Sequence, residues 1–164
     1  MKSYQYFAAN AWHDPSTGSY FESENPATGE VWAKLPDCNA EDVNRAVAAA
    51  RSAYCDGPWG KLHPAERGRV LRRIGDTISR HAERLGEVDI RDNGRVPSAT
   101  SALQPGAWQV DSFHYYAGMC DKFEGRVIPA EVPDMHNFLT FEPFGVVAQI
   151  LPWNSPLGDP ADAT

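Results

Sequence analysis

One short segment near the C-terminal end of the 164-residue chain places the strongest constraint on its fold. Residues 146–151 form a run of apolar and β-branched residues interrupted only by Gln149. Such a run is typical of a strand that is buried on both faces of a parallel sheet. Because a buried strand needs hydrogen-bonded neighbours, the run predicts an α/β fold. Ligands gather beyond the carboxyl ends of such strands, and here the sequence Pro-Trp-Asn-Ser-Pro follows at 152–156.

Two interpretations of this Pro-Trp-Asn-Ser-Pro sequence are open. The side-chain amide of Asn154, held between two prolines, can donate a hydrogen bond to an oxyanion, and the indole of Trp153 can pack against a cofactor. Alternatively, the prolines make a stiff loop in which Trp153 covers the core and Asn154 supports a turn. Other catalytic signatures are absent from the sequence, including GxGxxG, the P-loop and GxSxG.

Upstream of this segment, residues 20–35 have the pattern of two strands joined by a turn. The turn lies at 25–30, where a proline fixes φ and a glycine can take a positive φ. A first helix is predicted to begin after Asn39, whose side chain can cap free N–H groups, and to stop at Gly57-Pro58.

Two further helices are predicted. One begins at Pro64 and ends at Asn93-Gly94, with apolar side chains recurring every three, four or seven residues on one face. The other runs over 107–123 and is apolar around most of its circumference, so we expect it to be buried between other elements. On periodicity alone, Trp108 and His114 of this helix are core side chains.

Composition and charge exclude several classes of function. The formal net charge of −7 has the wrong sign for sequence-independent nucleic-acid binding. The longest apolar run is far too short to span a bilayer, and residues 1–10 show no secretory signal, so a cytoplasmic location is expected. Cys38, Cys55 and Cys120 are odd in number and widely spaced, which favours buried free thiols over a metal site.

The order and spacing of several motifs resemble the N-terminal portion of the NAD(P)-dependent aldehyde dehydrogenase superfamily. The resemblance runs over about 20–157, and the tail at 158–164 is expected to be irregular. The matching segments are Asn25-Pro26-Ala27-Thr28-Gly29-Glu30, the Ala40-to-Ala53 helix, Trp59 with Pro64 and Arg67, Asp92-Asn93-Gly94, Tyr115-Tyr116-Ala117-Gly118 with Asp121-Lys122, Glu142-Pro143-Phe144-Gly145-Val146-Val147, and Ile150-Leu151-Pro152-Trp153-Asn154.

The resemblance implies a reaction and a set of roles. In the family, a cysteine thiolate attacks an aldehyde, hydride passes to the nicotinamide of NAD or NADP, and a glutamate-activated water releases the carboxylic acid. By resemblance, Asn154 would be the oxyanion donor, and Leu151, Pro152 and Trp153 would line the cofactor cleft. Trp108 would face the substrate tunnel, and residues 136–143 would belong to an arm that pairs strands between subunits, which implies a homo-oligomer.

The resemblance also implies what this stretch lacks. Ser155 stands where many family members have an aromatic residue, which implies a different tunnel wall. The match stops after Leu157, so the chain would hold the hairpin, the helices, the first Rossmann-like strand and part of the arm. The nucleophilic cysteine and the general-base glutamate would lie beyond Thr164, and none of the three cysteines matches the nucleophile.

Two functional hypotheses follow from this resemblance. In the first, the chain is a truncated aldehyde dehydrogenase that is inactive alone. In the second, it is a non-catalytic module that pairs with full-length homologues through the strand at 136–143. The unpaired strand at 146–151 also predicts self-association or poor solubility.

Overall fold

The N-terminal third of the computed structural model, which describes residues 1–96 and 107–154, is built on a three-stranded sheet. Strands β4 (Tyr20–Asn25) and β5 (Glu30–Pro36) form the predicted antiparallel hairpin, and β1 (Lys2–Ser3) adds to β5 in parallel. The Asn25 side chain accepts a hydrogen bond from the Ala27 backbone N–H at 3.0 Å, and Gly29 takes a φ of 70°. The turn thus closes as its residues predict.

A second small hairpin precedes this sheet and was not predicted from the sequence. Strands β2 (Tyr6–Ala8) and β3 (Ala11–His13) pair antiparallel through a two-residue turn. Both turn residues, Ala9 and Asn10, have positive φ (49° and 62°). Such a turn usually carries Asn-Gly or Gly-Gly, so an Ala-Asn turn gives little sequence signal.

Helix α1 (Ala40–Cys55) begins where the cap predicted it. The Asn39 side chain accepts from the backbone N–H groups of Glu41 and Asp42, and the Asp42 carboxylate in turn accepts from the Asn39 N–H. The helix ends just before Gly57-Pro58, and a short 3-10 turn, η1 (Trp59–Lys61), leads into the next helix. The predicted boundaries are confirmed.

The single helix predicted over 64–93 is wrong, because the chain breaks it into α2 (Pro64–Arg80) and α3 (Ala82–Asn93). His81, at φ −110° and ψ 11°, leaves the helical region and caps both helices. The break lets α2 pack along α5 while α3 turns to pack against β4. A continuous apolar stripe does not reveal such a change of direction. The predicted end is right, since Gly94 takes the left-handed conformation at φ 71°.

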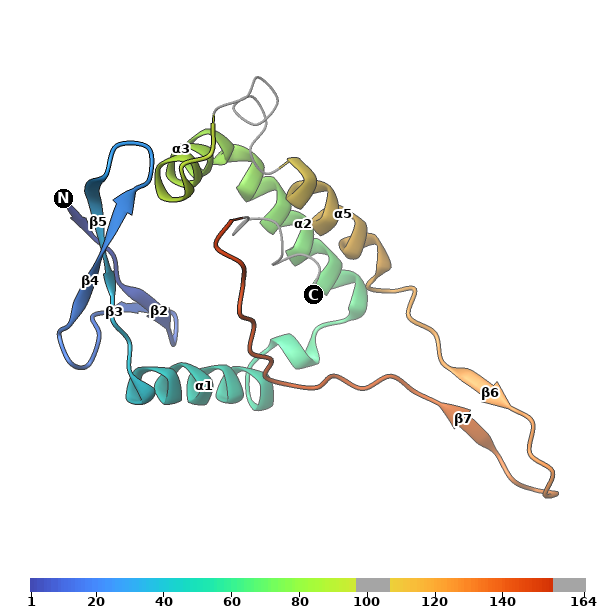
Figure 1. Ribbon diagram of the computed structural model, residues 1–164. Helices are drawn as coiled ribbons and strands as arrows, with labels where there is room; N and C mark the ends of the chain where they lie inside the picture. The colour runs from blue at the N-terminus through green and yellow to red at the C-terminus, as the bar shows by residue number, and fades with distance from the viewer. Residues whose placement is uncertain (97–106, 155–164) are drawn as a thin grey trace.

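Helix α5 (Ala107–Met119) lies along α2, as Figure 1 shows, and the two approach closely at glycines. The prediction that this helix is buried around most of its circumference is wrong. Phe113 and Ala117 are buried, whereas the side chains of Trp108 and Tyr115 are exposed. The expected end at residue 123 is also four residues too late.

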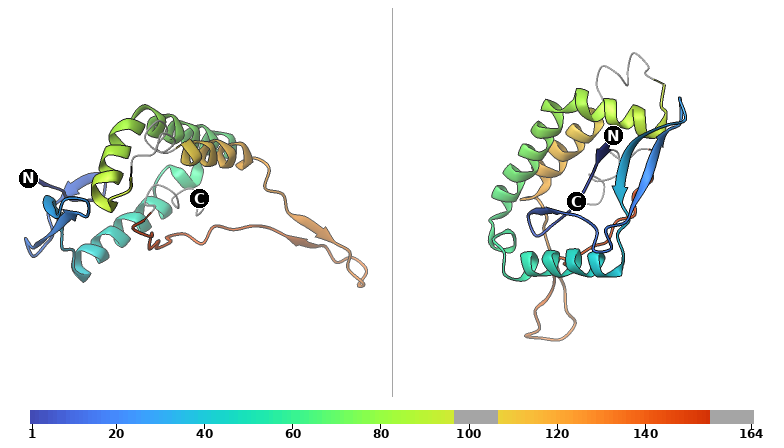
Figure 2. Two further views of the ribbon diagram at one scale, coloured as in Figure 1. Left: turned by 45° about the horizontal axis from the view of Figure 1, so that its top comes forward. Right: turned by 90° about the vertical axis from the view of Figure 1, so that its left-hand side faces the viewer.

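The chain then leaves the helices as a long hairpin. Strands β6 (Arg126–Ile128) and β7 (Asn137–Leu139) pair antiparallel and project away from the other elements (Figures 1 and 2). The predicted strand at 146–151 does not form: this segment has no ladder partner among the described residues, and Ile150 is fully exposed. A strand cannot persist without neighbours that satisfy its backbone groups.

The described elements form a frame with few buried apolar side chains. The right-hand view of Figure 2 shows the sheet, α1, the pair α2 and α5, and then α3 arranged as a frame. Within the described residues, the buried apolar side chains are those of Ala8, Ala33, Phe113 and Ala117. No helix of residues 1–96 and 107–154 has the length and apolarity needed to cross a membrane.

Candidate functional site

The predicted site residues lie at the end of the described chain. Leu151 and Trp153 present exposed side chains, Trp153 at 76% of its full accessible surface, and Asn154 is also exposed. In Figure 1 this red segment passes from the end of α1 toward α2 and α3. Ser155, the predicted tunnel-wall residue, and the expected tail at 158–164 lie outside the described residues.

Arg95 holds this segment from the side of α3. Its Nη2 donates a hydrogen bond of 2.6 Å to the backbone carbonyl of Asn154, 59 residues further along the chain. Sequence reasoning missed this contact. The available signal was the cation directly after the Asn93-Gly94 helix stop, which places a long side chain at a fixed exit from the helix.

A polar cluster at the end of α3 fixes Arg95 itself. Nη1 of Arg95 lies 3.8 Å from the largely buried Asp89 carboxylate, which also accepts from the Asn93 side-chain amide at 2.9 Å. The Asn93 amide oxygen accepts from the Arg95 backbone N–H at 2.8 Å. Both the backbone and the side chain of Arg95 are therefore oriented by neighbours on α3.

The end of α3 is in turn joined to the sheet. The Ser23 hydroxyl on β4 donates to the Asp92 carboxylate at 2.7 Å, and the Trp32 indole on β5 donates to Ser23 at 3.1 Å. The Arg91 guanidinium lies 5.9 Å from the centre of the Trp32 ring. A side chain at Gly94 would come within 3.0 Å of Pro26 in the β4–β5 turn. These contacts give the base of Arg95 a rigid support.

Trp108, the predicted tunnel residue, lies in the first turn of α5 and is not part of the polar cluster around Arg95. It is 55% exposed, and within residues 1–96 and 107–154 no hydrogen bond ties it to Asn154. The structure thus brings Asn154 to the end of α3 and leaves Trp108 on a separate element.

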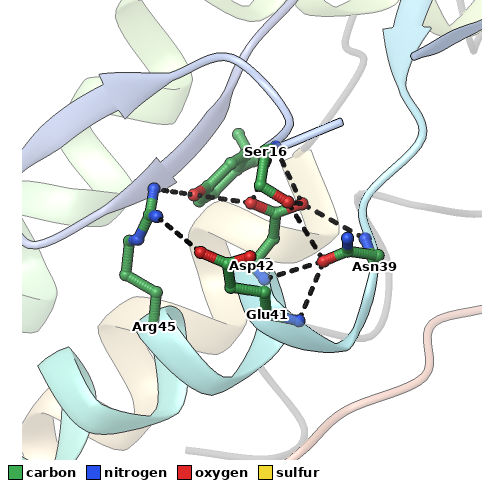
Figure 3. A network of polar contacts seen from close by, with 6 residues as sticks. Ser16, Asn39, Glu41, Asp42 and Arg45 are labelled. Carbon is green, nitrogen blue, oxygen red and sulfur yellow. Dashed lines mark hydrogen bonds and ion pairs between the residues drawn. The ribbon is translucent and has the colours of Figure 1, made fainter. Parts of the chain in front are cut away.

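A second polar network lies at the other end of the frame (Figure 3). The Asp42 carboxylate, 1% exposed, accepts from the Tyr6 hydroxyl and from the backbone N–H and hydroxyl of Ser16 at 3.0–3.2 Å. Burial raises the pKa of Asp42, but the hydrogen bonds from Asn39, Ser16 and Tyr6 outweigh it and lower the pKa below its ordinary value. Every atom of this carboxylate faces a donor from the same chain, so the network is a structural joint between α1 and the N-terminal segment.

A cavity of about 780 Å³ lies between the end of α1, η1 and the segment around Pro143 and Gly145. Its lining includes Tyr54, Trp59 and Arg67 but none of the predicted site residues. The Nε of Arg67 is buried without a hydrogen-bond partner among the described residues. Because that atom is closed off by the protein's own atoms, the cavity gives no ligand access to it.

The cysteines are free, as predicted, but two of them are not buried. Cys38 and Cys55 are exposed, and Cys120 is half-buried. Partial desolvation and the carboxylates of Asp42 and Asp37 raise the pKa of the Cys38 thiol. Since the thiolate is the nucleophilic form, this environment disfavours reactivity at Cys38.

The residues that precede Asn154 belong to the exposed surface of the chain. Leu151 and Trp153 offer exposed apolar and aromatic surface beside the Asn154 amide. The sequence contains no glycine-rich phosphate loop.

Comparison with known proteins identifies the class of fold. A model of the "Aldehyde dehydrogenase family" matches residues 12–163. The (Z)-2-((N-methylformamido)methylene)-5-hydroxybutyrolactone dehydrogenase of Acinetobacter baylyi is 41% identical over 157 residues, covering 96% of this chain and 31% of that protein. The human mitochondrial aldehyde dehydrogenase is 40% identical over 154 residues, covering 93% and 29%.

Solved structures agree with the sequence comparison. The NAD+ complex of the aldehyde dehydrogenase from Bacillus cereus superposes with a TM-score of 0.90 at 36% identity, covering 97% of this chain and 32% of that one. The chain belongs to the aldehyde dehydrogenase family. It spans about a third of the length of the relatives it matches.

Proposed function

We propose that this chain supplies the N-terminal part of an NAD(P)-dependent aldehyde dehydrogenase, which oxidises an aldehyde to a carboxylic acid. The observation that carries the proposal is the near-complete match of the chain to the family, including the Pro152-Trp153-Asn154 sequence. The B. cereus relative, bound to NAD+ in its structure, supports the cofactor class.

In this proposal Asn154 donates its side-chain amide to the oxyanion that forms when the aldehyde carbon becomes tetrahedral. An amide held in place before the reaction stabilises that charge at little reorganisation cost. Leu151, Pro152 and Trp153 form one wall of the cofactor cleft, and NAD or NADP, when bound, serves as the hydride acceptor. Trp108 and Ser155 line the path of the aldehyde.

A chimera tests this proposal. The chain replaces the corresponding N-terminal part of the B. cereus aldehyde dehydrogenase, and oxidation of a series of aldehydes is followed with NAD+ and with NADP+. We expect turnover that Asn154→Ala lowers by about 100- to 1000-fold, the cost of removing one oxyanion donor. Asn44→Ala, at an exposed position of α1, is the matched control and should retain full turnover. A folded chimera in which Asn154→Ala leaves kcat unchanged would contradict the proposed role.

The 164-residue chain by itself is expected to show no aldehyde oxidation. Cys38, the thiol whose environment raises its pKa, is poorly suited to attack a carbonyl. An assay of the purified chain with NAD+ and NADP+ checks this expectation, and turnover that is lost on Cys38→Ser, Cys55→Ser or Cys120→Ser would overturn it.

A second function is favoured by the β6–β7 hairpin. Val127, Phe138 and Leu139 are exposed on its two strands, and Phe141 follows at 71% exposure. Exposed apolar strands with free edges are templates for pairing with another chain. We infer that residues 136–143 pair with a second copy of this chain or with a full-length homologue.

Sedimentation equilibrium tests this pairing. Phe138→Lys should weaken self-association at least tenfold, because it places a charge on the paired surface. Phe7→Lys is the control, since Phe7 is similarly exposed (54% against 62%) on the separate β2–β3 hairpin. A wild-type chain that stays monomeric and does not co-purify with the full-length B. cereus enzyme would contradict the pairing.

A further inference from the structure

We propose that Arg95 is a positioning residue that holds the backbone of Asn154, and so fixes the place from which the Asn154 amide is presented. This inference rests on the proposed function for the role of Asn154. The contact between Arg95 and Asn154 does not depend on that role.

The hydrogen bond from Arg95 joins Asn154, at the exposed end of the described chain, to the end of α3, which is itself bonded to the sheet. A 2.6 Å hydrogen bond from a guanidinium is charge-assisted, and such bonds are roughly twice as strong as neutral ones. Its acceptor is the carbonyl of Asn154, not the side-chain amide. The amide of Asn154 therefore stays free to donate while its own backbone is held.

The geometry around Arg95 requires an arginine. One terminal nitrogen donates to Asn154 and the other faces the Asp89 carboxylate at 3.8 Å. The single ammonium of a lysine is a point charge and cannot span both partners in the fixed fork of a guanidinium. The Asp89 side chain is only 13% exposed, so its charge attracts Arg95 with less solvent screening than a surface pair would have.

Contacts between the end of α3 and the sheet fix the position from which Arg95 binds Asn154. Arg95 follows directly on Gly94, whose left-handed turn packs against Pro26. The same helix end is bonded to β4 through Ser23 and Asp92. The sheet, α3 and Arg95 thus form one continuous path of contacts that ends at Asn154.

NMR relaxation of the 164-residue chain labelled with 15N-asparagine tests the proposal. In the wild type we expect the backbone N–H of Asn154 to have an order parameter of about 0.85, the value of rigid backbone. In Arg95→Ala it should fall below about 0.6, the range of flexible backbone. Arg95→Lys should give an intermediate value, because it restores one of the two contacts.

Two references keep the test specific. Asn39, in the cap of α1, reports whether the fold is intact and should not change. Arg84→Ala removes another exposed cation of α3 that has no part in this support, and should leave Asn154 ordered. If Arg95→Ala also changes the order parameter of Asn39, its fold is disturbed and the Arg95→Lys variant becomes the test. An order parameter of Asn154 in Arg95→Lys that lies below the wild-type value, with Asn39 unchanged, would support the proposal, and an unchanged value would contradict it.

A flexible Asn154 in the wild type, or an unchanged order parameter in a folded Arg95→Ala variant, would overturn the proposal. The NMR measurement involves no aldehyde or cofactor, so its failure is distinct from an inactive chimera. In an active chimera, Arg95→Ala should lower kcat at least tenfold with partial recovery in Arg95→Lys, a graded rescue that a general loss of folding would not produce.

Discussion

Asp42 joins the N-terminal hairpin to α1 through a carboxylate that receives hydrogen bonds from three directions. Tyr6 and Ser16 reach it from the N-terminal segment, and the Asn39 N–H reaches it from the helix cap. Because these donors lower the pKa of Asp42 despite its burial, the folded state prefers the ionised carboxylate more than the unfolded chain does. This contribution to stability is fully present above the ordinary pKa of about 3.9 and is lost as the pH falls through the lower pKa of the folded state.

Asp42→Asn should therefore lower the midpoint of thermal unfolding by several degrees at pH 7 and flatten its dependence on pH below about 4. Circular dichroism melts between pH 2.5 and 7 measure both effects. Asp37→Asn, an exposed acid close to the same cap, is the control and should leave the midpoint at pH 7 unchanged. Equal pH dependence in wild type and Asp42→Asn would show that Asp42 does not carry this linkage.

The same residues mark what local sequence can predict. Asn39 was predicted as a cap because capping acts over three residues, and the sequence displays it directly. The burial of Asp42 was not predicted, since its partners Tyr6 and Ser16 lie 36 and 26 residues away. An acidic residue in the first turn of a helix is normally an exposed partner of the helix dipole. Its burial follows from tertiary packing alone.

At the scale of elements, the pair α2 and α5 depends on a close approach at Gly68. A Cβ on Gly68 would lie 2.5 Å from the Ala117 carbonyl oxygen, which belongs to rigid helix backbone. Gly68→Ala should therefore destabilise the chain by about 1–3 kcal/mol, the usual cost of overpacking. Gly118→Ala is a matched control on α5: no atom lies within 4 Å of its added methyl group, so it should stabilise the helix by about 0.5–1 kcal/mol.

Urea unfolding of the two variants measures this difference. Opposite shifts of the unfolding midpoint, with Gly68→Ala lower and Gly118→Ala higher, are the expected outcome. A Gly68→Ala variant as stable as Gly118→Ala would mean that the helices separate without cost.

The prediction of helices and strands succeeded where a residue within the element sets its boundary. It failed where packing against another element determines the boundary. Gly94 stops α3 because its left-handed conformation needs no partner. The break at His81 has no comparable signal, since it depends on α3 packing against β4 while α2 follows α5. The strand expected at 146–151 failed for the same reason, because apolar β-branched residues favour a strand only when a ladder is beside them.

The candidate site shows the same division at the scale of the whole molecule. Asn154 is a candidate from the sequence because its neighbours in the chain carry the family resemblance, and its role stays a prediction. Arg95 was not found, because its contact with Asn154 joins segments 59 residues apart. Only the path of the chain around the frame brings the two together.

The frame itself leaves an unusually large surface in contact with solvent. The accessible surface is 12238 Å², whereas a folded monomer of 18.1 kDa is expected to expose about 8,100 Å². The excess is roughly half as much again, and it includes the fully exposed side chains of Phe144 and Ile150. A chain that buries this little apolar surface gains little to offset its conformational entropy.

We therefore expect the monomeric 164-residue chain to unfold in a broad transition that has a measurable midpoint but a low enthalpy. A cooperative domain of this length would absorb roughly 115 kcal/mol at its midpoint, at about 0.7 kcal/mol per residue. Calorimetry at low concentration should give well under half of that value, and the chain should bind a hydrophobic dye such as ANS before heating. The full-length B. cereus relative, in which the matched region is 32% of the chain, is the control and should show a sharp transition without dye binding. A dilute monomer that melts cooperatively with the full enthalpy would show that the open frame is stable by itself.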